Sequence, residues 1–112
     1  MAYIERKHER IRSLNLLNYD CLDHAGNVVS SGMGRTLDVS ENGILLETRY
    51  EIAENTKISI SIGLKDEVVD IVGNVIYSRQ EQNDMFQAGV EFKATDAVAS
   101  RVLNEYIRDM KG

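Results

Sequence analysis

The clearest strand pattern in the chain is Lys57-Ile58-Ser59-Ile60-Ser61-Ile62-Gly63-Leu64, in which apolar and small residues alternate strictly. Because successive side chains of a β-strand point to opposite faces, this alternation places the isoleucines on one face and the serines on the other. One apolar face is typical of a strand that covers a core on one side and meets water on the other. The pattern therefore predicts a half-buried strand over Lys57–Leu64.

Further strands are expected on both sides of this segment. The sequence predicts them over residues 14–21, 35–39, 43–48, 68–79 and 86–92. Polar connections are expected over residues 40–42, 65–67 and 80–84, and a longer glycine-containing turn over residues 23–34. Within the fifth strand, one face is expected to carry Val69, Ile71, Gly73, Val75 and Tyr77.

The last segment has a helical period instead. Apolar residues recur at spacings of three and four over about residues 95–110, which predicts an amphipathic helix with Thr95 or Asp96 as its N-terminal cap. Its apolar stripe comprises Val98, Ala99, Val102, Leu103, Tyr106, Ile107 and Met110. Six strands with short turns leave no room for crossover helices, so the sheet should be antiparallel, and closing it removes exposed edges. The predicted fold is all-β: a six-stranded antiparallel β-barrel with one C-terminal α-helix.

Length and composition narrow the class of protein. With 112 residues, of which 43% are hydrophobic and 28% charged, the chain is expected to form one globular domain. Its 13 basic and 18 acidic residues give a net charge of −5, which argues against binding a nucleic acid polymer. No apolar run is long enough for membrane insertion, so a cytoplasmic location is expected. Cys21 is the single cysteine, and a buried, inert thiol is the favoured interpretation.

An acid, a hydroxyl and a glycine lie between two apolar runs in Leu37-Asp38-Val39-Ser40-Glu41-Asn42-Gly43-Ile44. Asp38 and Ser40 are two positions apart, so on an extended chain they project from the same face. Gly43 would allow a positive φ or the close approach of a ligand. The same residues also suit an ordinary hairpin turn, because short polar side chains bond nearby backbone amides. The spacing alone leaves both interpretations open.

A basic cluster near the N-terminus contains Arg6, Lys7 and Arg10. Residues 1–12 have no convincing apolar period and are expected to form a flexible arm ahead of a barrel over residues 13–112. A guanidinium can bond a phosphate at two points or take O6 and N7 of guanine together. A carboxylate such as that of Asp38 complements the donors on the Watson–Crick edge of guanine. Together the two clusters suggest a surface for a small, anionic, purine-containing ligand.

These motifs resemble those of PilZ domains, small barrels that bind the bacterial second messenger cyclic di-GMP. The resemblance covers nearly the whole chain and comprises, in order, Arg6-x-x-x-Arg10, Asp38-x-Ser40-x-x-Gly43, Gly73-x-Val75-x-Tyr77 and Gly89-Val90-Glu91-Phe92. It implies a cyclic di-GMP receptor whose ligand-binding residues are Arg6, Arg10, Asp38, Ser40 and Gly43, with Lys7 and Tyr77 as secondary candidates. It also implies that the arm reorders on binding and presents a new surface to a downstream protein.

Other functions have weaker support. His8 and His24 lack the spacing of a zinc site, so no bound metal or other cofactor is expected. No motif for hydrolysis is visible, so no enzymatic activity is expected. A barrel for single-stranded nucleic acid would need exposed aromatic residues and a basic groove. The alternative function is a ligand-independent adaptor between proteins. Glu5 stands where many PilZ domains have a basic residue, which favours one bound ligand over a stacked pair.

Overall fold

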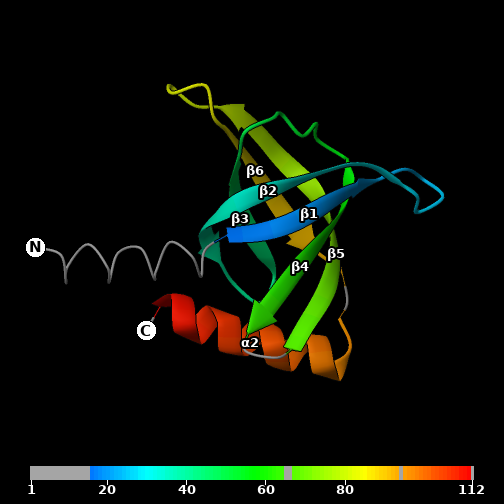
Figure 1. Ribbon diagram of the computed structural model, residues 1–112, viewed down its shortest axis with the longest axis vertical. Helices are drawn as coiled ribbons and strands as arrows, with labels where there is room; N and C mark the ends of the chain where they lie inside the picture. Colours follow the sequence, from blue (N-terminus) through cyan, green and yellow to red (C-terminus); the bar gives the residue numbers. More distant parts are fainter. Residues whose placement is uncertain (1–15, 65–66, 94, 112) are drawn as a thin grey trace, which may run out of the picture.

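The computed structural model describes residues 16–64, 67–93 and 95–111 (Figure 1). Its elements are β1 (Leu16–Leu22), β2 (Val28–Val39), β3 (Gly43–Thr48), β4 (Lys57–Leu64), β5 (Glu67–Gln80), β6 (Phe86–Phe92) and α2 (Ala97–Lys111). All neighbouring strands are antiparallel, and the order β1-β2-β3-β6-β5-β4 closes on itself. The predicted six-stranded antiparallel barrel with one helix is therefore confirmed.

The interior of the barrel is filled by the alternating apolar side chains of its strands. In β4, Ile58, Ile60 and Ile62 are completely buried, as their period of two predicts. Each such side chain contributes roughly 1.5–3 kcal/mol by leaving water. In β1, Tyr19 and Cys21 point into the same core, and the Cys21 thiol is buried and free.

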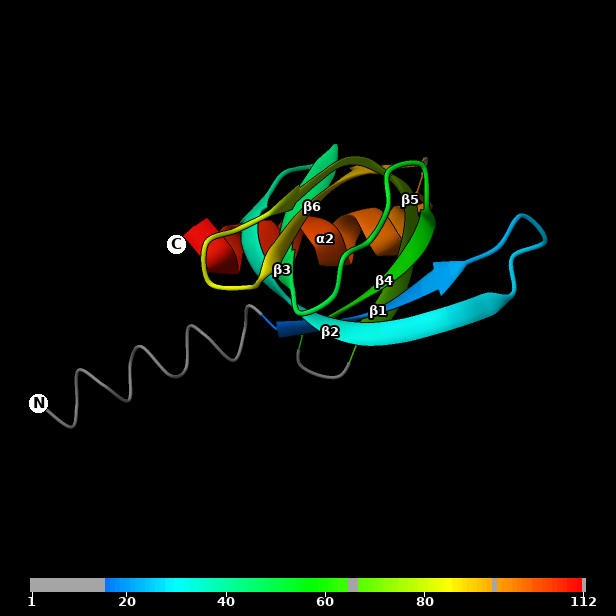
Figure 2. The ribbon, with the colours of Figure 1, turned by 90° about the horizontal axis from the view of Figure 1, so that it is seen from above.

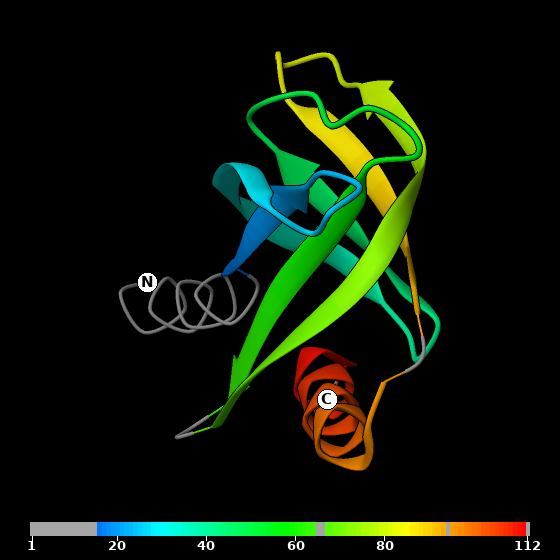
Figure 3. The same ribbon diagram turned by 90° about the vertical axis from the view of Figure 1, so that its right-hand side faces the viewer.

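Helix α2 closes one end of the barrel. Figure 2 shows it across the opening of the ring of strands, and Figures 1 and 3 show it beside the ends of β4 and β5. Its buried face contains Ala99, Val102, Leu103 and Tyr106, whereas Val98, which was expected in the stripe, is exposed. Asp96 is the cap, because its Oδ1 accepts the Ala99 N–H at 2.8 Å. Within the described residues, no helix is long and apolar enough to cross a membrane.

The second strand begins earlier than expected. The predicted turn over residues 23–34 is wrong, because β2 starts at Val28 and pairs with β1. Gly32 makes room for a core side chain, because a Cβ on Gly32 would lie 2.6 Å from the Tyr19 hydroxyl oxygen. The true turn is short, and Asp23 Oδ1 accepts the N–H groups of Ala25 and Asn27 at 2.9 Å each.

Two of the three β-bulges in the described strands decide which way the candidate site residues point. One lies between Thr36 and Asp38 of β2, and the other between Val75 and Tyr77 of β5. The third lies between β1 and β2, where the register shifts between Cys21 and Leu22 and Val29 is the extra residue. A bulge adds one residue to a strand, so it shifts the alternation of all residues beyond it. Val75 is consequently buried, but Tyr77 is exposed and does not share the inner face as expected.

Candidate ligand-binding site

The turn between β2 and β3 is held by Ser40 and Gly43. The Ser40 N–H donates to the Gly43 carbonyl oxygen at 2.8 Å, and the Ser40 hydroxyl accepts the Asn42 N–H at 3.2 Å. The Asn42 carbonyl in turn accepts the Phe92 N–H at 2.8 Å, which ties the turn to the end of β6. The polar residues that suggested a hairpin turn therefore do form one, and a hydrogen bond from β6 holds this turn in place.

Asp38 points outward because of the bulge in β2. Thr36 and Val39 are both buried although they are three residues apart, so the bulge leaves Asp38 on the outer face, where Ser40 is exposed too. Asp38 Oδ1 accepts the N–H of Val39 at 2.9 Å, which fixes the carboxylate against its own backbone. A carboxylate has further lone pairs, so this bond leaves Asp38 able to accept from a ligand.

Tyr77 reaches the same outer surface from β5. Gly89 of β6 lies opposite Tyr77, and a Cβ on Gly89 would be 3.1 Å from Tyr77 Cβ and 3.4 Å from Tyr77 Cδ2. The missing side chain of Gly89 thus gives Tyr77 the space in which it lies against β6. About 37% of Tyr77 remains exposed, which leaves aromatic surface open to a planar group.

These elements surround one shallow hollow of about 240 Å³. Its polar wall contains Asp38 and Ser40, and Tyr77 stands on the opposite strand pair. The full lining is Asp38, Val39, Ser40, Gly43, Ile44, Leu45, Ile76, Tyr77, Gly89 and Val90. The structure therefore brings together four of the candidate residues, namely Asp38, Ser40, Gly43 and Tyr77.

Gly43 does not have the positive φ that was one of its two expected roles, and its role in the close approach of a ligand stays a prediction. Its φ is not positive, since Gly26 is the only glycine with a positive φ in the described part of the chain. Instead, a Cβ on Gly43 would lie 2.4 Å from the carbonyl oxygen of Val90 on β6. The glycine is thus required by the close approach of β3 and β6.

The basic candidates lie outside the described residues. Arg6, Lys7 and Arg10, together with Glu5, belong to the segment that precedes Leu16. Their contact with the hollow consequently stays a prediction. The expected flexible arm over residues 1–12 also stays a prediction.

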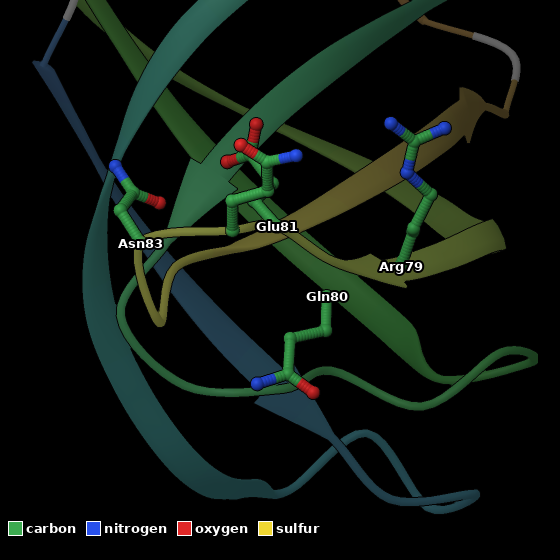
Figure 4. A pocket seen from close by; sticks show the side chains of 5 residues that line it. Arg79, Gln80, Glu81 and Asn83 are labelled. Atoms are coloured by element: carbon green, nitrogen blue, oxygen red, sulfur yellow. The ribbon is translucent and has the colours of Figure 1, made fainter.

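A larger hollow of about 670 Å³ lies at the turn between β5 and β6. Its lining is Arg79, Gln80, Glu81, Gln82 and Asn83, and Figure 4 shows the Arg79 and Gln80 side chains pointing away from each other. Glu81 Oε2 accepts a hydrogen bond from Gln87 at 2.7 Å. Because these lining residues are consecutive in one hairpin, no second element of the described chain brings chemistry to this hollow. We therefore take the smaller hollow as the candidate site.

Sequence reasoning missed part of the lining. Leu45 and Ile76 contribute apolar surface to the hollow. The alternation that buries Ile44 and Leu46 leaves Leu45 outward, so an apolar residue on an outer face was a usable signal. Ile76 gave no such signal, because a bulge has no fixed sequence marker. No group of three or more metal-ligating side chains is found in the described ranges.

Comparison with known proteins identifies a family and solved structures with the same fold. The family model described as PilZ domain matches residues 4–109. No curated protein matches the chain. The structure of a PilZ domain of CeSA from a cellulose-synthesizing bacterium has the same fold, with a TM-score of 0.58 and 12% sequence identity. That match covers 87% of this chain and 94% of the other.

Proposed function

The chain belongs to the PilZ domain family, and on this premise we propose that it is a receptor for cyclic di-GMP. The observation that carries the proposal is the convergence of Asp38, Ser40 and Tyr77 on one hollow. A carboxylate, a hydroxyl and an aromatic ring match the three parts of this ligand: the donor edge of guanine, the phosphodiester and the flat face of the base. The proposed action is binding, with no chemical step on the ligand.

Asp38 selects the base in this proposal. The N1–H and the 2-amino group of guanine are donors, whereas the corresponding edge of adenine offers an acceptor at N1. Because Asp38 Oδ1 already holds the Val39 N–H at 2.9 Å, the carboxylate is oriented before the ligand arrives. A hydrogen bond to a charged group contributes roughly 1.5–3 kcal/mol, so this contact decides a substantial part of the affinity.

Ser40 donates to a phosphate in this proposal. A hydroxyl has one donor and two acceptor positions, and the Ser40 oxygen already accepts the Asn42 N–H. Its O–H is therefore still available to donate a hydrogen bond to a ligand. An O–H is complementary to a phosphate oxygen, which favours this role over acceptance from the guanine amino group.

The hollow accommodates only part of a dinucleotide. Its volume of about 240 Å³ lies below the range of about 300–1,000 Å³ that is usual for small-molecule pockets. A second wall is needed, and we assign it to the N-terminal arm, where Arg6 and Arg10 bind phosphate or guanine and Lys7 adds charge. The carboxylate of Glu5 opposes a second stacked ligand, so we expect one ligand per chain.

The output of the receptor is a protein contact. In this proposal the arm is closed when Arg6 and Arg10 contact ligand in the hollow. The ligand binds the closed form more tightly than the open form, because only the closed form makes these contacts. Binding therefore shifts the arm toward the closed position. The closed arm then forms part of a surface for a downstream protein. The competing proposal is an adaptor that binds the same partner without ligand.

The test is a calorimetric titration with cyclic di-GMP. Arg10→Ala and Asp38→Ala should each weaken binding about tenfold to a hundredfold while the far-UV circular dichroism spectrum stays unchanged. Arg79→Ala and Asp84→Asn are matched controls from the β5–β6 turn and should bind as the wild type does. Wild-type protein that binds no cyclic di-GMP would favour the adaptor. If only Arg79→Ala weakened the binding of cyclic di-GMP, the ligand site would instead be the larger hollow at the β5–β6 turn.

A further inference from the structure

The first half of β2 has a free edge. Val28 and residues 30–33 pair with β1, whereas a register shift leaves Val29 out of that ladder. In the described chain the ladder between β2 and β3 begins only at Gly34, which lies opposite Thr48. Figure 2 shows this half of β2 with one long edge facing open space. Backbone N–H and C=O groups that point away from β1 therefore have no strand partner within the described residues. Such an edge is a template for another extended chain.

This edge lacks two of the common protections against pairing. Natural edge strands are often blunted by charged side chains or proline, and Val28-Val29-Ser30-Ser31-Gly32-Met33 contains neither. Its one irregularity is a β-bulge at Val29, where the register with β1 shifts between Cys21 and Leu22. It instead exposes apolar side chains: Val29 is 64% exposed, and Val28 and Met33 are each 57% exposed. Exposed apolar groups beside free backbone groups are the two features that strand addition uses.

We propose that two copies of this protein associate through the free edge of β2, antiparallel and about a two-fold axis perpendicular to the sheet. An axis through Ser31 places Val29 opposite Met33 of the second copy, and Ser31 opposite Ser31 of the second copy. Apolar side chains then meet apolar ones and hydroxyls meet hydroxyls. The sequence of the edge is therefore complementary to itself, as a two-fold interface requires.

Charge does not oppose this pairing, although the chain carries a net charge of −5. The acid hydrogen-bonded to this edge is Asp20 of β1, which accepts a hydrogen bond from Ser31 at 2.5 Å. Two copies of Asp20 would be separated by three strand spacings, or about 14 Å. This distance exceeds the Debye length of about 8 Å at physiological ionic strength, so their repulsion is screened.

The interface is short, so the association should depend on concentration. A pair of six-residue edges buries less than the roughly 1,200 Å² of a standard stable interface, which places the dimer among weak, reversible complexes. The hollow near Asp38 and Ser40 lies at the other end of β2. The proposed dimer therefore leaves the candidate ligand site open, and it does not depend on the ligand proposal.

The experiment is sedimentation velocity over a range of protein concentrations, with reductant present to keep Cys21 as a thiol. The wild type should move from a 12.6 kDa monomer toward twice that mass as concentration rises. V29K/M33K and V29E/M33E should each remain monomeric, because both apolar contacts become like-charge contacts. An equimolar mixture of the two variants should recover the dimer, since every such contact then joins opposite charges.

The control is Val68→Lys, which changes an equally accessible valine on β5 that is 70% exposed. This variant should associate as the wild type does, and all variants should keep the wild-type circular dichroism spectrum. Slower amide hydrogen exchange of residues 28–33 at high concentration would locate the contact on the edge. A wild type that stays monomeric at every concentration overturns the proposal, as does a dimer that survives in V29K/M33K.

Discussion

Gly43 on β3 lies so close to Val90 on β6 that the carbonyl oxygen of Val90 occupies the place of a side chain. A Cβ built on Gly43 would be 2.4 Å from that oxygen, far inside any normal contact. Gly73 on β5 has the same relation to β6, with a Cβ 2.4 Å from the carbonyl oxygen of Glu91. Two glycines thus let β6 pass closely between β3 and β5, next to the turn that carries Ser40. The candidate site therefore lies beside strands whose close approach depends on glycine.

Gly43→Ala is expected to destabilise the fold itself. The new methyl group meets backbone that belongs to a paired strand, so it forces a strand displacement that costs about 1–3 kcal/mol or more. Urea denaturation followed by circular dichroism measures this loss. Gly63→Ala is the matched control, because its Cβ would meet first a methyl group of Val68 at 3.2 Å, which can move. Equal stability of Gly43→Ala and wild type would refute this explanation of the glycine.

A buried hydrogen bond joins α2 to the barrel, and its removal should be costly. Thr36 and Tyr106 are each about 1% exposed, and their hydroxyl oxygens are 2.8 Å apart. Tyr106→Phe leaves the Thr36 hydroxyl buried without a partner, which costs roughly 1–3 kcal/mol of unfolding free energy. Adding Thr36→Val removes that orphan, so the double variant should lose less than the sum of the single losses. Strictly additive losses in denaturant titrations would contradict this interpretation.

The sequence predicted the barrel well wherever side chains alternate without interruption. The isoleucines of β4 are buried because every second position faces the core. The errors are concentrated where the alternation is interrupted. Tyr77 was assigned to the inner face, and the bulge after Val75 places it outside. A bulge is determined by the neighbouring strand, so its position is not visible in the strand that contains it.

The start of β2 was missed for a related reason. Serines and glycines around Gly32 are typical of a turn, but β1 supplies the pairing that makes them a strand, and Tyr19 needs the space above Gly32. For the site, residue chemistry led correctly to Asp38 and Ser40 as neighbours on one surface. The apolar wall formed by Leu45 and Ile76 depends on how distant strands meet, which the sequence does not encode locally.

Stability should fall at alkaline pH because of the buried tyrosines. Burial raises the pKa of Tyr106 above 10.0, only partly opposed by its bond to Thr36, and burial also raises the pKa of Tyr19. The folded state then holds these protons to higher pH than the unfolded state does. The stability that these two protonated tyrosines contribute to the folded state is complete below pH 10.0, and it is lost as pH rises through their folded-state pKa values.

The measurement for this effect is the urea midpoint of the wild type and of Tyr106→Phe between about pH 8 and about pH 11. Phenylalanine does not titrate, so the midpoint of the variant should decline less steeply. Identical slopes for Tyr106→Phe and wild type would contradict the assignment to Tyr106.

Tyr77 should contribute to ligand affinity through its ring alone. If a guanine of cyclic di-GMP stacks on the exposed face of Tyr77, Tyr77→Phe should retain the affinity, whereas Tyr77→Ala should lose the stacking contribution of about 1–3 kcal/mol, or roughly 5- to 150-fold. Gly89→Ala is a test of position, because its methyl group would press on Tyr77 Cβ at 3.1 Å and tilt the ring. It should weaken binding less than Tyr77→Ala does. Titrations of the three variants against the wild type measure these effects, and unchanged affinity in Tyr77→Ala would remove Tyr77 from the site.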